Sequence, residues 1–464
     1  MRRQGILKKK KILIEFFVLL LVLMVLSGSL LPVGGNINPF SHYSNEPVPM
    51  GTADYGVNAS GQTYIYTTSS TPYTYVKYTL VLWNNSLING NFVNSGNGLN
   101  PTAVAFDSSN GYVYVANAGS NTVSVINGST DKVVVIIAVG TLPYGVAFDP
   151  SNGYVYVANA GSSTVSVING TTDSVIAAIA VGSEPDAVAF DPSNGYVYVT
   201  NVASNNVSVI SGSTDRVVAT TGVGFSPFGV AFDPSNGYIY VANYGSGNVS
   251  VINGSTNTVI ANITVGYFPH GVAFDSSNRY IYVANEDSFN VSVINGSIDS
   301  VIATIAVGPN PDAVAFDPSN GYIYVANAGS NTVSVISGST NTVIANITVG
   351  TGPDAVAFNS SNRYIYVANW GSGNVSVISG STDSVIAAIA VGSQPDAVAF
   401  DSTNGYIYVA NYHSGTVSIL STTSGSFKQL PSGLSTIEYY TGIGAGVAIV
   451  VVVAGLIVYM ERRK

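Results

Sequence analysis

The chain has 464 residues, of which 46% are hydrophobic and only 8% are charged, and its formal net charge at pH 7 is −9. It has no cysteine, which excludes disulfides, thiolate metal sites and a cysteine nucleophile. Outside the two ends the acidic residues outnumber the basic ones. The few basic residues form no patch that could contact phosphates, which argues against nucleic acid as a partner.

Residues 1–34 have the composition of a signal peptide or an N-terminal membrane anchor. Basic residues precede an apolar run at 12–33. Small residues at 27–29 favour cleavage, whereas Glu15 and the length of the run favour retention, so both alternatives stay open. In either case the positive-inside rule places the following chain outside the cell, beginning with an N-terminal extracellular segment at 35–78.

A 42-residue repeat fills the middle of the chain, and each copy begins with a proline. The eight prolines are Pro101, Pro143, Pro185, Pro227, Pro269, Pro311, Pro353 and Pro395. The unit that starts at Pro311 contains four short β-rich runs, which are Ala313–Phe316, Tyr322–Ala326, Thr332–Ile336 and Thr342–Val349. Turn sequences such as DPSNG and SGST separate them. Four strands in a repeat of about 40 to 50 residues are typical of a β-propeller blade.

The eighth copy is incomplete, because it stops after its third strand at Leu420. The segment 79–98 aligns with the third and fourth strands of a repeat, so we expect it to supply the missing outer strand. The predicted fold class is therefore all-β, an eight-bladed propeller of four-stranded antiparallel blades over residues 79–430. A seven-bladed ring is the alternative if an end unit is not incorporated, and Phe427–Leu430 is an alternative last strand.

A linker at 431–440 leads to a second apolar run at 441–460, which is followed by a basic tail at 461–464. About 20 apolar residues are enough to span a bilayer. We therefore predict a transmembrane helix, with the tail in the cytoplasm and the ectodomain outside the cell membrane.

The repeat resembles the YVTN-repeat propellers found in archaeal surface-layer proteins. The resemblance covers residues 79–420 and is closest at Tyr198–Asn201, which reads YVTN, whereas the other seven copies read VAN. It implies a surface protein that is adhesive or associated with the cell envelope, with envelope glycans or surface proteins as partners. Homologous propellers also include lactone-opening enzymes, lyases and cofactor-binding subunits, so the resemblance does not exclude catalysis.

Comparison of the eight copies separates a constant face from a variable one. In a blade of this order the two hairpin turns open on one face, and the loops before strand one and between strands two and three open on the other. The hairpin aspartates, such as Asp107, are predicted turn formers. The asparagines that end each second strand, such as Asn117, are expected to be structural, in turn or left-handed conformations. The other face varies, as binding loops do.

Aromatic residues gather in the variable loops, where exposed clusters mark contact surfaces for sugars or proteins. The alternative is that they plug the channel or pack between blades. The candidate ligand-binding residues are Tyr144, Phe225, Phe228, Tyr244, Tyr267, Phe268, His270, Trp370 and Tyr412. The loops between strands two and three also carry Glu286, Asp287, Phe289 and His413.

Four aspartates directly follow repeat prolines and should line the mouth of the channel. They are Asp186, Asp312, Asp354 and Asp396. A ring of carboxylates can hold a hard cation such as calcium. The alternative is that these side chains are solvated or cap backbone amides, and no organic cofactor is expected.

Asn-x-Ser/Thr sequences recur in the repeats and are candidate glycosylation sites at Asn127, Asn169, Asn206, Asn253, Asn295 and Asn374. No sequence motif of a hydrolase, metalloprotease or nucleotide-binding protein is present. The predicted function is therefore a non-catalytic surface-binding, adhesion or envelope protein. The alternative is an extracellular lactonase-like or lyase-like enzyme, assisted by a metal on the aspartate ring.

Overall fold

A computed structural model of the chain describes residues 53–57, 63–67, 76–79, 88–94, 98–422, 447–450 and 459–462. The chain divides into two units, which are described separately. One contains residues 85–424, and the other contains residues 1–84 and 425–464.

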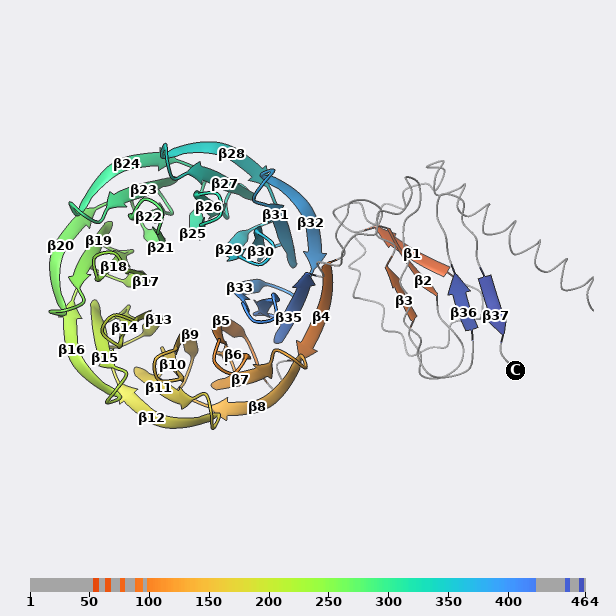
Figure 1. The fold of residues 1–464 in the computed structure, drawn as a ribbon, viewed down its shortest axis with the longest axis horizontal. Coiled ribbons are helices and arrows are strands. Elements are labelled where there is room, and N and C mark those ends of the chain that lie inside the picture. The colour runs from red at the N-terminus through yellow and green to blue at the C-terminus, as the bar shows by residue number, and fades with distance from the viewer. Residues whose placement is uncertain are drawn as a thin grey trace, which may run out of the picture. The chain divides into compact units, whose positions relative to one another are not determined.

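The described residues of the first unit, 88–94 and 98–422, form an eight-bladed β-propeller of four-stranded antiparallel sheets, as the repeat predicts (Figure 1). The innermost strands of blades 1 to 8 are β5 (Pro101–Asp107), β9 (Pro143–Asp149), β13 (Pro185–Asp191), β17 (Pro227–Asp233), β21 (Pro269–Asp275), β25 (Pro311–Asp317), β29 (Pro353–Asn359) and β33 (Pro395–Phe400). The second strands are β6 (Tyr112–Asn117), β10 (Tyr154–Asn159), β14 (Tyr196–Asn201), β18 (Tyr238–Asn243), β22 (Tyr280–Asn285), β26 (Tyr322–Asn327), β30 (Tyr364–Asn369) and β34 (Ile407–Asn411).

The two outer strands of each blade complete the wheel. The third strands are β7 (Thr122–Asn127), β11 (Thr164–Asn169), β15 (Asn206–Ser211), β19 (Asn248–Asn253), β23 (Asn290–Asn295), β27 (Thr332–Ser337), β31 (Asn374–Ser379) and β35 (Thr416–Thr422). The outermost strands are β8 (Lys132–Ala138), β12 (Ser174–Ala180), β16 (Arg216–Gly222), β20 (Thr258–Thr264), β24 (Ser300–Ala306), β28 (Thr342–Thr348), β32 (Ser384–Ala390) and β4 (Ile88–Asn94).

The eighth blade is assembled from both ends of the repeat region. β4 pairs antiparallel with β35, with Asn94 opposite Thr416 and Ile88 opposite Thr422 (Figure 1). This confirms that an N-terminal strand closes the ring, and that the ring has eight blades rather than seven. The closing strand begins at Ile88, and Thr79 belongs to a strand of the other unit. The alternative last strand, at 427–430, lies outside the described residues, and β4 occupies its expected place.

Each interface between neighbouring blades contains one hydrophobic cluster, which a blade alone would leave exposed to water. Between blades 2 and 3, Tyr156 and Val165 pack with Val197 and Ile210, and all four side chains are fully buried. Tyrosine hydroxyls also link successive blades, as when Tyr114 donates a 2.9 Å hydrogen bond to Asp173. Apolar burial and repeated polar contacts therefore hold the ring together without disulfides.

The constant turn residues have structural roles. Asp107 accepts a 2.8 Å hydrogen bond from the backbone N–H of Ser109, which confirms that the hairpin aspartates form turns. Asn117 is fully buried and donates a 2.9 Å hydrogen bond to the Ser124 hydroxyl. Of the two conformations predicted for these asparagines, the turn is observed, because the carbonyl of Asn117 accepts a 3.3 Å hydrogen bond from the backbone N–H of Ser120. The left-handed backbone is not observed at Asn117, whose side chain bridges the second and third strands.

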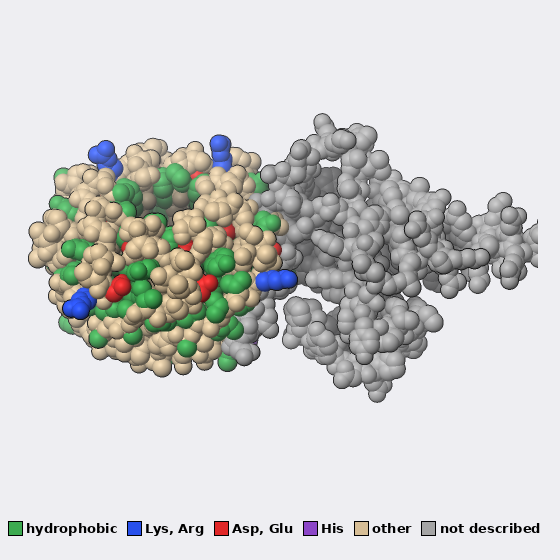
Figure 2. All heavy atoms as spheres, turned by 60° about the horizontal axis from the view of Figure 1, so that its bottom comes forward, with side chains coloured by type: hydrophobic (Ala, Val, Ile, Leu, Met, Phe, Trp, Pro, Cys, Tyr) green, Lys and Arg blue, Asp and Glu red, His purple; other side chains and the backbone are tan. Residues whose placement is uncertain are grey.

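The variable loops share one face, as expected. The backbone N–H of Tyr244, after β18, donates a 2.9 Å hydrogen bond to the carbonyl of Ser226, just before β17. Equivalent bonds join Glu286 to Phe268 and Ala328 to Asn310. We call the surface made by these loops the loop face. Figure 2 shows that charged side chains are few and scattered over the visible side of the propeller.

The other unit contains a three-stranded antiparallel sheet of β1 (Ala53–Val57), β2 (Thr63–Thr67) and β3 (Val76–Thr79). It also contains a two-stranded pairing of β36 (Val447–Val450) with β37 (Tyr459–Arg462).

β36 lies in the segment 441–460 predicted as a transmembrane helix, and β37 extends from the end of that segment into the predicted tail. Val447, Ile449 and Val450 of β36 are β-branched residues that suit a strand. Most of 441–460 lies outside the described residues, so the transmembrane helix stays a prediction. Among the described residues no helix has the length and apolar character needed to cross a membrane. The predicted signal or anchor segment at 1–34 and the linker at 431–440 lie outside the described residues.

Candidate functional site

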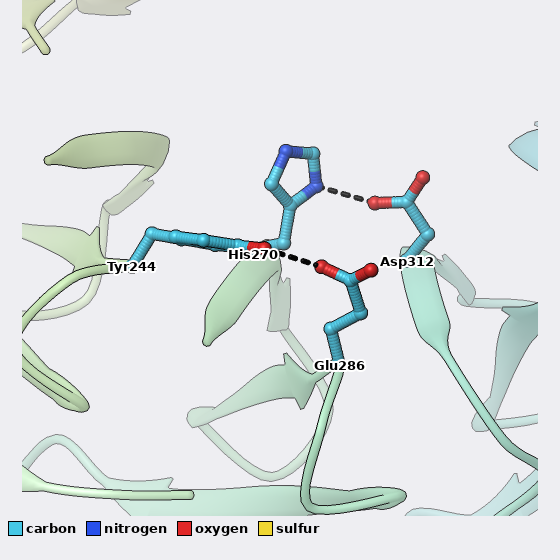
Figure 3. Close-up of polar contacts among 4 residues, drawn as sticks. All are labelled: Tyr244, His270, Glu286 and Asp312. Atoms are coloured by element: carbon cyan, nitrogen blue, oxygen red, sulfur yellow. Dashed lines mark hydrogen bonds and ion pairs between the residues drawn. The ribbon is translucent and has the colours of Figure 1, made fainter. Parts of the chain in front are cut away.

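The residue after each repeat proline is the second residue of an innermost strand, so the eight side chains come from consecutive blades around the channel mouth. In blades 5 and 6 these residues form an ion pair, between Nδ1 of His270 and Oδ1 of Asp312 (Figure 3). Burial opposes a charge on His270, but the hydrogen bond and charge of Asp312 outweigh it and raise the pKa of the imidazole above 6.5. Burial also opposes the charge on Asp312, yet His270 holds the pKa of that carboxyl below its usual value.

At the same position of the channel mouth, blades 7 and 8 carry the carboxyl groups of Asp354 and Asp396, which can be protonated. Burial and the neighbouring charges of Asp312 and Asp396 raise the pKa of Asp354 to about 8. Burial raises the pKa of Asp396 to about 7, although its hydrogen bond with Asp354 acts in the opposite direction. These two groups therefore change charge near neutral pH, and a proton on one can be shared with its neighbours.

The four aspartates predicted as a metal site are not brought together as one ligand set. Asp186 stands on blade 3 and is separated around the ring from Asp312 by Phe228 and His270. Within the described residues no three His, Asp or Glu side chains are arranged to hold a metal ion. The arrangement instead supports proton sharing on blades 6 to 8.

Four of the predicted ligand-binding residues form one aromatic cluster on blades 4 and 5. The rings of Tyr244 and Phe268 stack with centroids 4.4 Å apart and an interplanar angle of 9°. Phe228 lies edge-on to Tyr244 at 5.5 Å and tilted to His270 at 5.4 Å. The expected grouping of these residues is thus observed, and the rings pack against one another between adjacent blades.

A pocket of about 320 Å³ opens beside this cluster. Its lining residues are Phe228, Tyr244, His270, Glu286, Asn310, Asp312 and Ala328. The Tyr244 hydroxyl donates a 3.0 Å hydrogen bond to Oε2 of Glu286, and Figure 3 shows this pair beside the His270–Asp312 pair. Burial and the contact with Glu286 raise the pKa of Tyr244 to about 12, so the phenol stays a donor. Two carboxyl groups and three rings therefore converge on one space.

The rim of this sector is unusually exposed for aromatic residues. Phe225 is 66% exposed, Tyr267 is 75% exposed and Phe289 is 45% exposed. Phe268 and Phe289 have φ values of 55° and 51°, in the left-handed region where bulky side chains are rare. At the position of Phe289 the other blades have only Asn, Ser or Gly. Phe289 is therefore held in a strained backbone conformation with its side chain partly in water, and it does not serve the packing of the propeller.

The remaining predicted residues lie elsewhere on the propeller. Trp370 and Tyr412 form a tilted ring pair on blades 7 and 8, with centroids 5.5 Å apart. Tyr144, on blade 2, is not part of the pocket lining. The candidate glycosylation residues are half-buried, and Asn206 accepts a 2.7 Å hydrogen bond from Asn201. Their modification stays a prediction.

Sequence reasoning missed the pairing of His270 with Asp312 and the contribution of Asn310. It assigned His270 to an aromatic group and Asp312 to a metal ring. The signal was present, since the two residues are one repeat apart and follow equivalent prolines.

Comparison with known proteins gives one family match. The model of the YNCE-like beta-propeller family matches residues 93–399. A solved chain of Kuenenia stuttgartiensis hydrazine synthase is similar with a TM-score of 0.52 and 20% sequence identity, over 71% of this chain and 97% of that chain. At that identity the likeness shows the fold alone. No curated protein matches the chain.

Proposed function

This chain belongs to the YNCE-like β-propeller family, and we propose that within that fold it is a non-catalytic recognition protein of the cell surface. It binds an envelope glycan or surface protein through the loop face of blades 4 to 6. A propeller fold alone does not determine activity, because unrelated functions are carried by different sites on the same fold.

The observation that carries the proposal is the concentration of aromatic side chains in one sector of an otherwise repetitive ring. At the positions of Phe225 and Tyr267 the other six blades carry Leu, Thr, Ser or Pro. All eight blades share the same framework, so the departure is not required by the fold. Clustered exposed aromatic rings on loops are typical of contact surfaces.

The proposed location depends on the two ends of the sequence. Each of the apolar runs at 12–33 and 441–460 has basic residues on the side away from the propeller sequence. Under the positive-inside rule this supports export of the propeller and its attachment to the cell membrane. The resemblance to YVTN-repeat surface-layer proteins supports a role in the envelope.

The test compares two sectors of the same face. The full-length protein in detergent is applied to a glycan array and to immobilised envelope proteins. We expect binding to be lost in the variant Phe225→Ser/Tyr267→Ser/Phe289→Asn. The matched control is Leu99→Ser, at the position in blade 1 that corresponds to Phe225, where Leu99 is 57% exposed. Equal binding by both variants, or no binding by the wild type, would contradict the proposal.

A second candidate function is hydrolysis or elimination by acid–base catalysis. The favouring observation is the His270–Asp312 pair beside Asp354, whose pKa is raised to about 8 by burial and by Asp312. Turnover of a lactone panel that is abolished by His270→Gln would support this candidate against simple recognition.

A further inference from the structure

We propose that the pocket between blades 4, 5 and 6 binds a primary ammonium group, carried by a lysine side chain of a partner protein. This inference rests on the proposed recognition function and specifies its ligand. It follows from the charge of the pocket, from its apolar walls and from the way its rings already pack.

The charge of the pocket is acidic. Glu286 and Asp312 both line it, and among the described residues its lining includes one basic side chain, His270, which is paired with Asp312. An ionised carboxylate has about four acceptor sites, and Tyr244 uses one of those on Glu286. An ammonium group brings three donors and a positive charge, so it complements these free acceptors.

The walls of the pocket suit the methylene groups of a lysine side chain. Phe228 and Tyr244 meet edge-on, and Ala328 adds an aliphatic surface. Lysine commonly buries its stem along such apolar surface while its charged end reaches polar groups.

The same geometry disfavours a sugar as the occupant. A sugar needs an open aromatic face on which to stack, but Phe268 already covers one face of Tyr244 at 4.4 Å. The more open rings, Phe225 and Tyr267, are not part of the pocket lining. We therefore assign the pocket to the cationic side chain and the exposed rings to the surrounding contact surface.

The experiment uses the full-length protein in detergent and calorimetric titration at pH 8. The probe is Nα-acetyl-lysine methylamide, and its norleucine counterpart serves as the neutral control, with glucosamine and glucose as a second pair. We expect the lysine probe to bind and the norleucine probe to bind at least tenfold more weakly. Equal affinities for lysine and norleucine would overturn the proposal, and binding of glucosamine alone would replace lysine by an amino sugar.

Two variants locate the site. Glu286→Gln should weaken the lysine probe by about tenfold, which corresponds to about 1.4 kcal/mol. Asp287→Asn, at the exposed neighbouring residue outside the pocket lining, should weaken the lysine probe far less than Glu286→Gln does. An unchanged affinity in Glu286→Gln, with an unaltered unfolding midpoint, would overturn the assignment. If the lysine probe fails while the aromatic triple variant still loses envelope binding, only the ammonium assignment falls and the recognition function stands.

Discussion

His270 and Asp312 form an ion pair across two blades, although 42 residues separate them in the chain. They occupy the same position in consecutive repeats, and ring closure turns that spacing into direct contact. The side chains are 39% and 27% exposed, so solvent screens part of their attraction. Besides burial, the charge of Asp312 helps to raise the pKa values of Asp354 and Asp396 at the channel mouth.

The first prediction concerns the titration of His270. In Asp312→Asn the imidazole loses the partner that raises its pKa, while burial still opposes its charge, so we expect that pKa to fall. Histidine ring signals followed by NMR against pH measure the change. An unchanged His270 midpoint would show that the pair does not form in solution.

The same pair predicts how stability depends on pH. The raised pKa of His270 contributes stability that is present below about 6.5 and is lost as pH rises through the folded-state value. The lowered pKa of Asp312 contributes stability that is present above its unfolded value and is lost as pH falls through its lower folded value. Asp312→Asn should therefore cost the most in weakly acidic solution, about 1 kcal/mol after allowance for screening.

Asp354 should show the opposite consequence of burial. Its pKa is raised to about 8, so the folded state holds a proton that the unfolded state releases at lower pH. The resulting penalty grows as pH rises from about 4 to 8. Asp354→Asn should match the wild type at pH 4 and exceed its unfolding free energy by about 1–2 kcal/mol at pH 9. Denaturant titrations at both pH values test this, and a variant that is less stable at pH 9 would refute it.

Affinity for an ammonium ligand should be higher at pH 8.5 than at pH 6. At pH 6 His270 is protonated and competes for Asp312, while Asp354 and Asp396, with pKa values of about 8 and 7, are neutral. The groups that act on His270 are Asp312, Asp186 and Glu286. Lysine keeps its charge at both pH values, so we expect a several-fold loss in calorimetric affinity at pH 6. A flat profile would argue that no ammonium group enters the pocket.

The backbone around the pair predicts the effect of adding one methyl group. Gly271 approaches the next blade so closely that a Cβ atom there would lie 2.2 Å from the carbonyl oxygen of Asp312. The copies with a ring after the proline, at Tyr144, Phe228 and His270, are also those with glycine next. Gly271→Ala should therefore destabilise the propeller by about 2 kcal/mol and shift the His270 signals. Ala313→Gly, at the equivalent position of blade 6, is the control, and equal unfolding midpoints would contradict the argument.

The ring was predictable because the repeat supplied the strand pattern, and the missing fourth strand after Leu420 had a matching segment before Pro101. The contacts within the candidate site were less predictable from the sequence. Which side chains meet depends on how far adjacent blades converge, and sequence spacing does not give that distance. The four aspartates were expected to act as one metal-binding ring. Asp312, Asp354 and Asp396 do interact, but Asp312 also pairs with His270, and Asp186 acts through its charge on His270 and Asp396. The buried bridge made by Asn117 was likewise hidden, since asparagine at a strand end suggests a turn.

The last prediction separates stability from binding at Phe289. Its left-handed backbone suits the asparagine found at this position in blade 6, Asn331. There Oδ1 of Asn331 accepts a 2.9 Å hydrogen bond from the backbone N–H of Gly352, a contact that phenylalanine cannot make. Phe289→Asn should relieve the strain and supply an equivalent acceptor for the N–H of Asn310, so we expect a gain of about 1 kcal/mol.

The same substitution should weaken envelope binding, because it removes a ring from the contact surface. A gain in stability with a loss of function is expected where a strained residue is kept for recognition. The reverse change, Asn331→Phe, should lower the unfolding free energy without creating a new binding sector, since blade 6 has no other exposed ring beside it. Thermal unfolding and array binding of both variants test these two expectations. A Phe289→Asn protein that is less stable and binds normally would show that the Phe289 side chain packs within the propeller and does not contact the ligand.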